Sequence, residues 1–280
     1  MSNYKIGFIG GGNMASSLMG GLLADGEVAS HIWVSDPDEA CLESLARRFN
    51  INVCQDNKEL VSAVDQVVFA VKPQVMQEVT SELKEVIHEH KPLVISIAAG
   101  IRESSLSAWL GDDVAIVRTM PNTPALVQSA ATVLYANKQV NSAQRDQAES
   151  IMRAVGVTVW VEDENMMDAV TALSGSGPAY LFLVMEMMEH AGQKLGLPQE
   201  VARLLTVQTA FGAAKMALES SEDVDTLRKY VTSPGGTTEQ ALDVFQQSEI
   251  QQIFDDALGA AHKRSIELAE QLSAKQQGEK

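Results

Sequence analysis

Cysteine is scarce in this 280-residue sequence, which contains only Cys41 and Cys54. Two cysteines at this spacing fit neither a metal site nor a disulfide framework, so we expect reduced thiols and a cytoplasmic location. The five histidines are scattered along the chain. We therefore expect no metal cofactor.

Long hydrophobic runs and positive charge are also in short supply. No apolar run approaches the ~20 residues that a membrane helix needs, and residues 1–5 lead into an apolar strand without signal-peptide character. Lys and Arg number 21 against 37 Asp and Glu, which gives a formal net charge of −16. Such an acidic chain is a poor candidate for binding nucleic acid or an anionic membrane.

What the sequence does contain is an alternation of short apolar strands and helices up to about residue 162. Residues 66–71 and 93–98 are nearly continuous apolar runs, as expected for strands that are covered on both faces. After residue 162 the strand signals vanish, and apolar residues recur at helical spacing. We predict an α/β fold with a Rossmann-like, mostly parallel sheet in a dinucleotide-binding domain over 1–162. An all-helical domain over 163–280 follows it.

The first strand and helix frame a glycine-rich turn. Apolar residues 4–9 are followed by Gly10-Gly11-Gly12-Asn13-Met14-Ala15, and helical spacing begins immediately afterwards. The pattern Gly-x-Gly-x-x-Ala is the dinucleotide fingerprint with alanine in its third position. Gly10 would permit the tight turn, Gly12 the approach of a pyrophosphate to the helix N-terminus, and Ala15 close packing of the helix on the strand.

The end of the second strand bears on the choice of nucleotide. A strand over 31–34 is followed by Ser35 and Asp36, where the residue that reads the adenosine ribose belongs. A carboxylate there would accept a hydrogen bond from a ribose 2′-hydroxyl and repel a 2′-phosphate. Alternatively, Asp36 caps a helix that begins at Pro37. Both roles are compatible, so the sequence leaves NAD and NADP open.

Other turns are predicted at the same edge of the sheet. Ligands of open α/β sheets bind beyond the carboxyl ends of the strands. Lys72 and Pro73 follow one buried strand, and the stiff polar turn 121–124 follows another. We expect both turns near the cofactor. Further on, Ser174–Pro178 is expected to break a helix before the next one begins.

The helix over residues 180–190 is apolar around most of its circumference. Such a helix must be buried on several sides, and a small helical domain can cover only one of them. We expect a partner subunit to cover another. Its methionines could also form a flexible ligand wall, but packing in a core or a dimer interface is the more common role.

The segment Ser233-Pro234-Gly235-Gly236-Thr237-Thr238 interrupts the helical half just before a new apolar-periodic run. A turn of this composition can present backbone N–H groups and hydroxyls at a helix start, which suits a carboxylate. The alternative is an ordinary corner between two helices with a threonine N-cap.

Taken together, these sequence features favour hydride transfer without strong acid catalysis. A dinucleotide site without metal ligands suggests redox chemistry on a nicotinamide. His190 and His262 show no carboxylate partner of the kind that an alcohol dehydrogenase uses to move a hydroxyl proton. A cationic imine needs little acid catalysis; it needs its carboxylate bound, its electrophilic carbon positioned and water excluded.

Five motifs in this order resemble pyrroline-5-carboxylate reductase, over almost the whole chain. The 233–238 segment is the most distinctive of them. The motifs are Gly-Gly-Gly-Asn-Met-Ala, Ala-Val-Lys-Pro (70–73), Met-Pro-Asn-Thr-Pro-Ala (120–125), Ser-Gly-Ser-Gly-Pro-Ala-Tyr (174–180) and Val-Thr-Ser-Pro-Gly-Gly-Thr-Thr (231–238).

The resemblance implies reduction of the cyclic imine 1-pyrroline-5-carboxylate to L-proline by NADPH or NADH, the last step of proline biosynthesis. It also implies a homodimer with intertwined helical domains, often assembled into a decamer. Many members of the family have small or basic residues after the second strand, which suit a 2′-phosphate, and Asp36 departs from that pattern.

The resemblance also implies the site residues. Thr238 would be the nearest group to a catalytic side chain, because it would hydrogen-bond near the ring nitrogen. The implied substrate-binding residues are Ser176, Val231, Ser233, Gly235, Gly236, Thr237 and Thr238. The implied cofactor-binding residues are Gly10, Gly11, Gly12, Asn13, Met14, Ala15, Ser35, Asp36, Asn57, Ala70, Val71, Lys72, Pro73, Pro121 and Asn122.

Two other functions share parts of this pattern. A β-hydroxyacid dehydrogenase also joins a glycine-rich sheet to a helical half, but it uses a lysine on the helix after the glycine-rich break. Here that helix has no lysine before Lys194. A nucleotide sensor without catalysis would not need the Thr237-Thr238 pair.

Overall fold

The computed structural model describes residues 4–275. The chain forms two compact units. The first comprises the residues up to Ser176 together with those from Ala261 onward, and the second comprises Gly177–Ala260.

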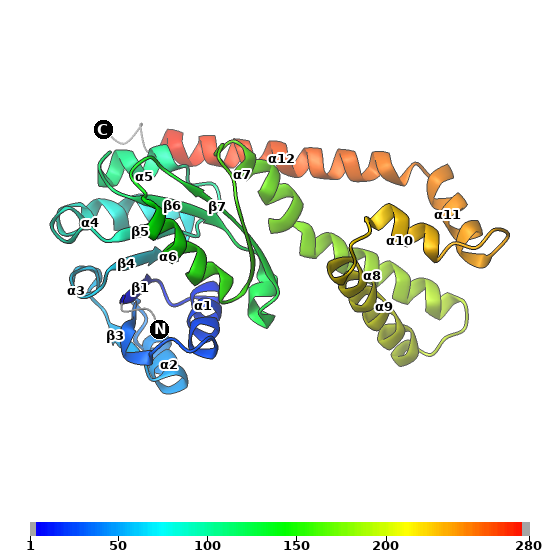
Figure 1. Cartoon of the computed structure of the whole chain (residues 1–280), viewed down its shortest axis with the longest axis horizontal. Helices are drawn as coiled ribbons and strands as arrows, with labels where there is room; N and C mark the ends of the chain where they lie inside the picture. Colours follow the sequence, from blue (N-terminus) through cyan, green and yellow to red (C-terminus); the bar gives the residue numbers. More distant parts are fainter. Residues whose placement is uncertain (1–3, 276–280) are drawn as a thin grey trace. The chain divides into compact units, whose positions relative to one another are not determined.

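The first unit is built on a sheet that has eight strands within residues 4–275, in the order β3-β2-β1-β4-β5-β6-β7-β8 (Figure 1). The strand pairs are parallel except for β6 and β7, which run antiparallel. The predicted Rossmann-like, mostly parallel sheet is therefore confirmed. The strands are β1 (Ile6–Ile9), β2 (Ile32–Ser35), β3 (Asn52–Cys54), β4 (Gln66–Phe69), β5 (Leu93–Ser96), β6 (Ile116–Met120), β7 (Ala130–Ala136) and β8 (Gly156–Trp160).

The register of β1 fixes where the strand ends meet. Ile9, the last residue of β1, pairs with Ser35 of β2 on one side and Phe69 of β4 on the other. The chain therefore leaves three neighbouring strands at one level. In a doubly wound sheet this is the switch point, beside which ligands bind.

Helices cover both faces of this sheet, as Figure 1 shows. Successive strand residues point to opposite faces, so Phe8 belongs to one apolar core and Ile9 to the other. The first core includes side chains of α1 (Asn13–Ala24), α2 (Glu39–Phe49) and α6 (Ser142–Arg153); the second includes those of α3 (Asn57–Ala63), α4 (Met76–His90) and α5 (Glu103–Leu110). Each fully buried Leu, Ile or Phe contributes roughly 1.5–3 kcal/mol, so these cores hold the sheet edge in place.

Side-chain caps mark where several of these helices begin. The Asp38 carboxylate accepts from the Ala40 N–H at 3.0 Å and caps α2, and Asp56 caps α3 through Lys58 N–H at 2.7 Å. The alternative role of Asp36 as a cap for a helix starting at Pro37 is therefore wrong. Helix α2 begins at Glu39 because Asp38, two residues later, has the extended backbone that an N-cap needs.

Three short 3₁₀ turns complete the connections: η1 (Ala29–His31), η2 (Pro73–Val75) and η3 (Thr123–Val127). From Met166 to Lys275 the chain is mostly helical. Its elements are α7 (Met166–Val170), the π-helical turn η4 (Thr171–Gly175), α8 (Gly177–Lys194), α9 (Gln199–Glu219), α10 (Val224–Tyr230), α11 (Thr237–Gln247) and α12 (Ile250–Lys275).

The expected helix break at Ser174–Pro178 is confirmed: η4 ends at Gly175 and α8 begins at Gly177, with Ser176 outside both. The chain widens into a π turn before the break, and the Ser176 N–H donates to the Thr171 carbonyl at 2.9 Å. The π turn, which absorbs one extra residue, is the feature that the sequence did not predict.

The end of α12 returns to the first unit and is anchored there by a buried carboxylate. Asp168 of α7 accepts from Ser265 Oγ at 2.7 Å and pairs with Arg102 at 3.3 Å. Ala269 is fully buried one turn further on. The hydrogen bonds compensate the desolvation of Asp168, which would otherwise be costly.

The second unit leaves many apolar side chains exposed. No residue of α8 is buried, and Phe182 is 66% exposed. Other exposed apolar residues of α8 and α9 are Leu181, Leu183, Met187, Met188, Val201, Leu204, Leu205, Val207, Phe211 and Met216. Within the described residues, no helix is long and apolar enough to cross a membrane. Patches of this kind mark surfaces that other molecules cover.

We therefore expect the protein to be an obligate oligomer that uses α8 and α9. Phe182→Glu should convert it to smaller, less stable species in sedimentation experiments, because a charge would be buried at the subunit contact. Val53→Glu is the matched control, since Val53 is an exposed apolar residue of β3 in the first unit, 38% exposed. A stable monomer for the wild-type chain would contradict this expectation.

Candidate functional site

The glycine-rich loop between β1 and α1 needs Gly10 for reasons internal to the chain. Gly10 has φ +99°, and a Cβ built there would lie 2.8 Å from the Ala70 carbonyl oxygen. Any other residue would be strained by its backbone and would collide with the adjacent strand end. Gly10 thus makes the tight turn that the fingerprint predicts.

Gly12 has a different explanation. Its φ is −64°, and a Cβ built there would meet no atom of the described chain within 4 Å. Neither backbone strain nor packing within this chain requires glycine at this position. Gly12 is the N-cap of α1 and makes no side-chain cap bond, so the first N–H groups of α1 face an open space. An open helix N-terminus of this kind can accept a phosphate group.

Ala15 completes the fingerprint. It lies in the first turn of α1 and is fully buried in the core between α1 and the sheet. A larger side chain would push the helix away from β1. The neighbouring Asn13 is exposed and Met14 is half-buried, so both lie at the surface of the same turn.

The end of β2 contacts the glycine-rich loop directly. The Asp36 carboxylate accepts from the Gly11 N–H through Oδ2 at 2.8 Å and from the Asp38 N–H through Oδ1 at 2.9 Å. Ser35 Oγ donates to Asn57 Oδ1 at 2.6 Å, and the Ser35 carbonyl accepts from Gly10 N–H at 2.8 Å. The structure therefore brings together Ser35, Asp36 and Asn57, three residues predicted to bind the cofactor, beside the loop.

Cys41 is a neighbour of this loop that the sequence analysis did not connect with it. Its thiol donates to the Gly11 carbonyl at 3.5 Å. Burial, together with the nearby carboxylates of Asp36 and Asp38, raises the pKa of the Cys41 thiol. The thiol therefore stays protonated at neutral pH, as a donor to the loop should.

The end of β4 supplies the opposite side of the loop. The Ala70 N–H donates to the Ile9 carbonyl at 2.9 Å, so the strand ends remain paired up to the turn. Lys72 is exposed at the N-cap of η2, whose first residue is Pro73, and Val71 is half-buried. Residues 70–73 thus reach the same edge of the sheet as Gly10.

The end of β6 is tied to the π turn rather than left open. Asn122 donates through Nδ2 to the Ser174 carbonyl at 3.0 Å and accepts from the Ala131 N–H at 3.0 Å. Pro121 beside it is buried. Two motifs that lie far apart in the sequence, 120–125 and 174–180, therefore meet in the first unit.

The predicted substrate loop lies in the second unit, at the start of α11. Gly235 has φ +75° and its N–H donates to Glu239 Oε2 at 2.6 Å, while Gly236 N–H donates to the Ser233 carbonyl at 3.0 Å. Gly236 is the N-cap of α11, and no side chain caps the helix. The alternative of a threonine N-cap is therefore wrong: Thr237 and Thr238 are the first two residues of the helix.

The contact between Glu239 and Gly235 indicates that this loop can bind a carboxylate. A carboxylate of the chain already accepts a backbone N–H of the loop, at the helix end where the dipole favours negative charge. Val231 and Ser233 are exposed, and Thr238 is half-buried. The only signal of this contact in the sequence is a glutamate four residues after Gly235. Ser176, the remaining predicted substrate residue, belongs to the first unit.

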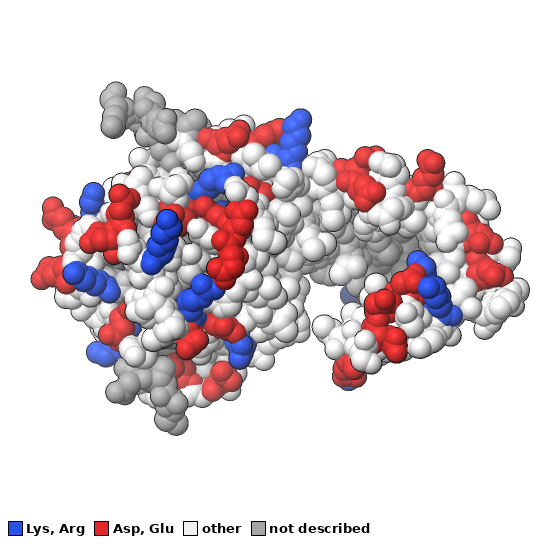
Figure 2. All heavy atoms as spheres, turned by 45° about the horizontal axis from the view of Figure 1, so that its top comes forward, with Lys and Arg blue, Asp and Glu red and all other residues white. Residues whose placement is uncertain are grey.

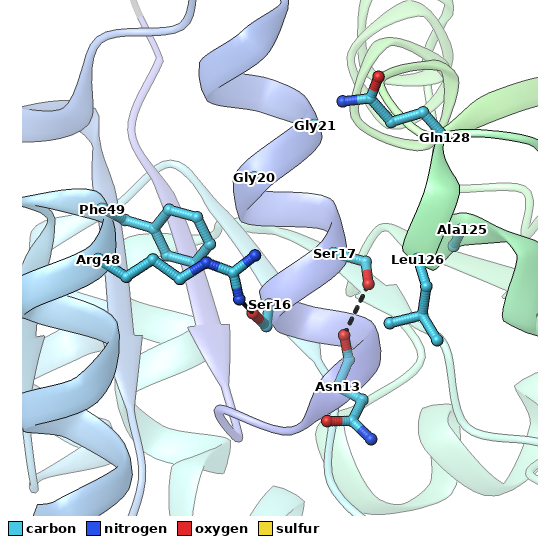
Figure 3. A pocket seen from close by; sticks show the side chains of 10 residues that line it. All are labelled: Asn13, Ser16, Ser17, Gly20, Gly21, Arg48, Phe49, Ala125, Leu126 and Gln128. Carbon is cyan, nitrogen blue, oxygen red and sulfur yellow. Dashed lines mark hydrogen bonds between the residues drawn. The ribbon is translucent and has the colours of Figure 1, made fainter.

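A pocket of about 300 Å³ lies along the outer face of α1. In Figure 3, Arg48 reaches from α2 toward Ser16 on α1, and Leu126 faces Asn13 from η3. Arg48 also lies over the Phe49 ring, 4.6 Å from its centroid. Asn13 is the predicted cofactor residue that lines this pocket, so the pocket begins where the fingerprint enters α1.

Neither metal ligands nor a basic surface distinguishes the site. No group of three or more potential ligands that could hold a metal ion occurs among residues 4–275. Figure 2 shows acidic side chains spread over the visible face with basic ones between them, in a chain with a net charge of −16. A negatively charged ligand must therefore rely on local donors such as helix N-termini and Lys72.

Two family models match different parts of the chain. Residues 5–100 match the model described as NADP oxidoreductase, coenzyme F420-dependent. Residues 164–268 match the model described as pyrroline-5-carboxylate reductase dimerisation.

Individual relatives match the chain from end to end. The pyrroline-5-carboxylate reductase of Pseudomonas aeruginosa is 51% identical over 272 residues, which cover 97% of this chain and 99% of the relative. The structure of the Coxiella burnetii pyrroline-5-carboxylate reductase superposes with a TM-score of 0.93 at 46% identity and covers 95% of this chain and 99% of that one. The Plasmodium falciparum pyrroline carboxylate reductase, solved with NADP bound, gives a TM-score of 0.84 at 31% identity, with 96% and 99% covered.

The Asp36 and Cys41 pair yields a prediction about thiol reactivity. Asp36→Asn keeps an acceptor near the Gly11 N–H but removes a charge that raises the Cys41 pKa. The pH at which Cys41 becomes alkylated by iodoacetamide should therefore fall in the variant. Mass spectrometry of the labelled peptide measures this shift. Cys54, whose pKa is raised to about 11 chiefly by burial, is the internal control. An unchanged pH profile for Cys41 would show that the Asp36 charge does not act on it.

Proposed function

This chain belongs to the pyrroline-5-carboxylate reductase family, and from that premise we propose how its residues carry out the reaction. The enzyme reduces 1-pyrroline-5-carboxylate to L-proline with NAD(P)H, the last step of proline biosynthesis. The observation that carries this conclusion is the 51% identity over 97% of the chain. The loop geometry described above adds a physical basis for it.

The glycine-rich end of the sheet is the proposed cofactor site. The open N-terminus of α1 at Gly12 binds the pyrophosphate, because its N–H groups are free and its dipole favours anions. Ser35, Asp36 and Asn57 lie beside the adenosine ribose, and residues 70–73 line the far side of the loop. When bound, the reduced nicotinamide supplies the hydride that the imine carbon accepts.

The segment 231–238 is the proposed substrate site. The substrate carboxylate binds the N–H groups and hydroxyls of Ser233, Gly236 and Thr237, where the chain already holds one carboxylate of its own on Gly235. Ser176 is also proposed to bind the substrate. The acid group anchors the ring, and the energy of that contact serves to position the electrophilic carbon.

Thr238 is the proposed group nearest to the reacting bond. Its hydroxyl hydrogen-bonds at the ring nitrogen, which carries the proton of the iminium and keeps it in the product amine. Hydride addition turns the C=N double bond into a single bond, and the electron pair of that bond moves to nitrogen. A protonated imine therefore needs orientation from Thr238 more than it needs a strong acid.

The helical part of the chain is the proposed assembly module. The protein is a homo-oligomer, as the dimerisation match over residues 164–268 indicates. We place the cofactor domain in residues 1–162 and the substrate and dimerisation domain in 163–280. The exposed faces of α8 and α9 support a homodimer, and we further propose assembly of dimers into a decamer. Two free thiols suit a cytoplasmic location.

An assay tests both the function and the role of Thr238. The wild-type chain should consume NADPH or NADH with 1-pyrroline-5-carboxylate and should not oxidise 3-hydroxy acids in the reverse direction. Thr238→Ala should lower turnover by more than about tenfold, a loss on the scale of removing one positioned hydrogen-bonding group. Gln240→Ala, at an exposed position in the same helix, is the control. Turnover by Thr238→Ala at the wild-type rate would remove this residue from the mechanism.

A second variant tests whether Asp36 affects the preference between NADPH and NADH. Asp36→Ser removes a carboxylate that would repel a 2′-phosphate, so the ratio of kcat/KM for NADPH to that for NADH should rise. The expected rise is about tenfold, the size of one charge contact near the surface. Steady-state kinetics with both nucleotides provides the measurement. If the ratio does not move, Asp36 only shapes the loop through Gly11.

A further inference from the structure

Asn122 occupies an unusual position between two backbone segments. Its side chain is 9% exposed and bonds to the chain at both ends of its amide: Nδ2 to the Ser174 carbonyl and Oδ1 to the Ala131 N–H, each at 3.0 Å. A flipped amide would set N–H against N–H and oxygen against oxygen. The two contacts therefore fix the orientation of the side chain, which is held inside the protein.

The segment that Asn122 holds is the π turn η4. Ser174 lies within this turn, and the Ser176 N–H closes it by donating to the Thr171 carbonyl at 2.9 Å. Wide turns of this kind are rare and are frequently found at functional sites, because they place one residue out of helical register. Here the π turn determines the position of Ser176, after which the chain enters the second unit.

A second contact joins the same two segments. A Cβ built at Gly175 would lie 2.6 Å from Met120 Cε, so the absence of a side chain at 175 lets the π turn approach the end of β6. Asn122 lies two residues beyond Met120. The end of β6 thus holds the turn at two points, one polar and one by close packing.

We propose that Asn122 is a positioning residue for the reduction: its amide holds the π turn so that Ser176 is presented to the substrate. This inference rests on the proposed function and replaces the expectation that Asn122 binds the cofactor. The amide is directed at protein backbone on both sides, so its contribution to catalysis passes through Ser176. Cofactor affinity should then be independent of the Asn122 side chain.

The direct test is Asn122→Asp. This change keeps the size of the side chain and the acceptor for Ala131 N–H, but it sets a carboxylate oxygen against the Ser174 carbonyl. We expect kcat/KM for 1-pyrroline-5-carboxylate to fall by about tenfold or more, as for a misplaced binding group. The Kd of NADPH, from its fluorescence, should change less than about twofold. Amide hydrogen exchange over residues 171–178 should be faster.

The pH dependence of the same variant provides a readout that general damage to the fold would not produce. When the introduced carboxyl becomes protonated, it can again donate to the Ser174 carbonyl. The deficit in kcat/KM relative to wild type should therefore shrink as the pH falls. Ser129→Ala is the matched control, because Ser129 lies in the same connection between β6 and β7 and is exposed. It should leave all three measurements unchanged.

Gly175→Ala approaches the same contact from the other side and covers the case in which Asn122→Asp does not fold. The added methyl group would lie 2.6 Å from Met120 Cε, so either the flexible end of Met120 or the turn must shift. We expect faster exchange over 171–178 without weaker NADPH binding. Weaker NADPH binding with unchanged exchange in Asn122→Asp would overturn the proposal in favour of a cofactor contact. Wild-type kinetics and exchange in both variants would overturn it as well. If the wild-type chain lacked reductase activity, the proposed function would fail. The hydrogen-exchange data alone would then test whether Asn122 holds the π turn.

Discussion

The parallel pairing of β1 between β2 and β4 is the constraint on which the cofactor site depends. Because Ile9 is level with Ser35 and Phe69, three chain segments turn away from the sheet at the same height. Gly10 can then bond to Ser35, Asp36 to Gly11, and Ala70 to Ile9. A shift of one residue in this register would turn each strand's side chains to the opposite face and separate these contacts.

Gly10 and Gly12 belong to the same motif but have different roles. Gly10 is required by a positive φ and by the Ala70 carbonyl, whereas Gly12 has room for a side chain and a backbone that any residue adopts. The fold requires the first glycine, and it does not require the second. The same distinction applies to two carboxylates. Asp38 caps its own helix, whereas Asp36 accepts a hydrogen bond from the glycine-rich loop. The site is therefore made by a few groups whose bonding is not needed to form a helix or strand.

The second unit depends on association in the way that the first depends on its sheet. Its long helices keep apolar side chains exposed, so one chain cannot remove them from water. The loop that precedes α11 is placed by glycine geometry and by Glu239, both local features. A substrate loop on an oligomerisation module would couple assembly to activity, since destabilising the helices would also misplace the loop.

By itself, the sequence determined the mostly parallel sheet, the order of its elements, the fingerprint turn at Gly10 and the family, because periodicity and glycine spacing are local properties of the chain. Only the tertiary structure decided that Asp38 rather than Asp36 caps α2, that Gly236 precedes α11 in place of a threonine cap, and that the chain widens into a π turn at Ser174. It also decided that Asp36 reaches Gly11 across 25 positions and Asn122 reaches Ser174 across 52. Such contacts arise from the packing of distant segments, and no pattern within either segment specifies them.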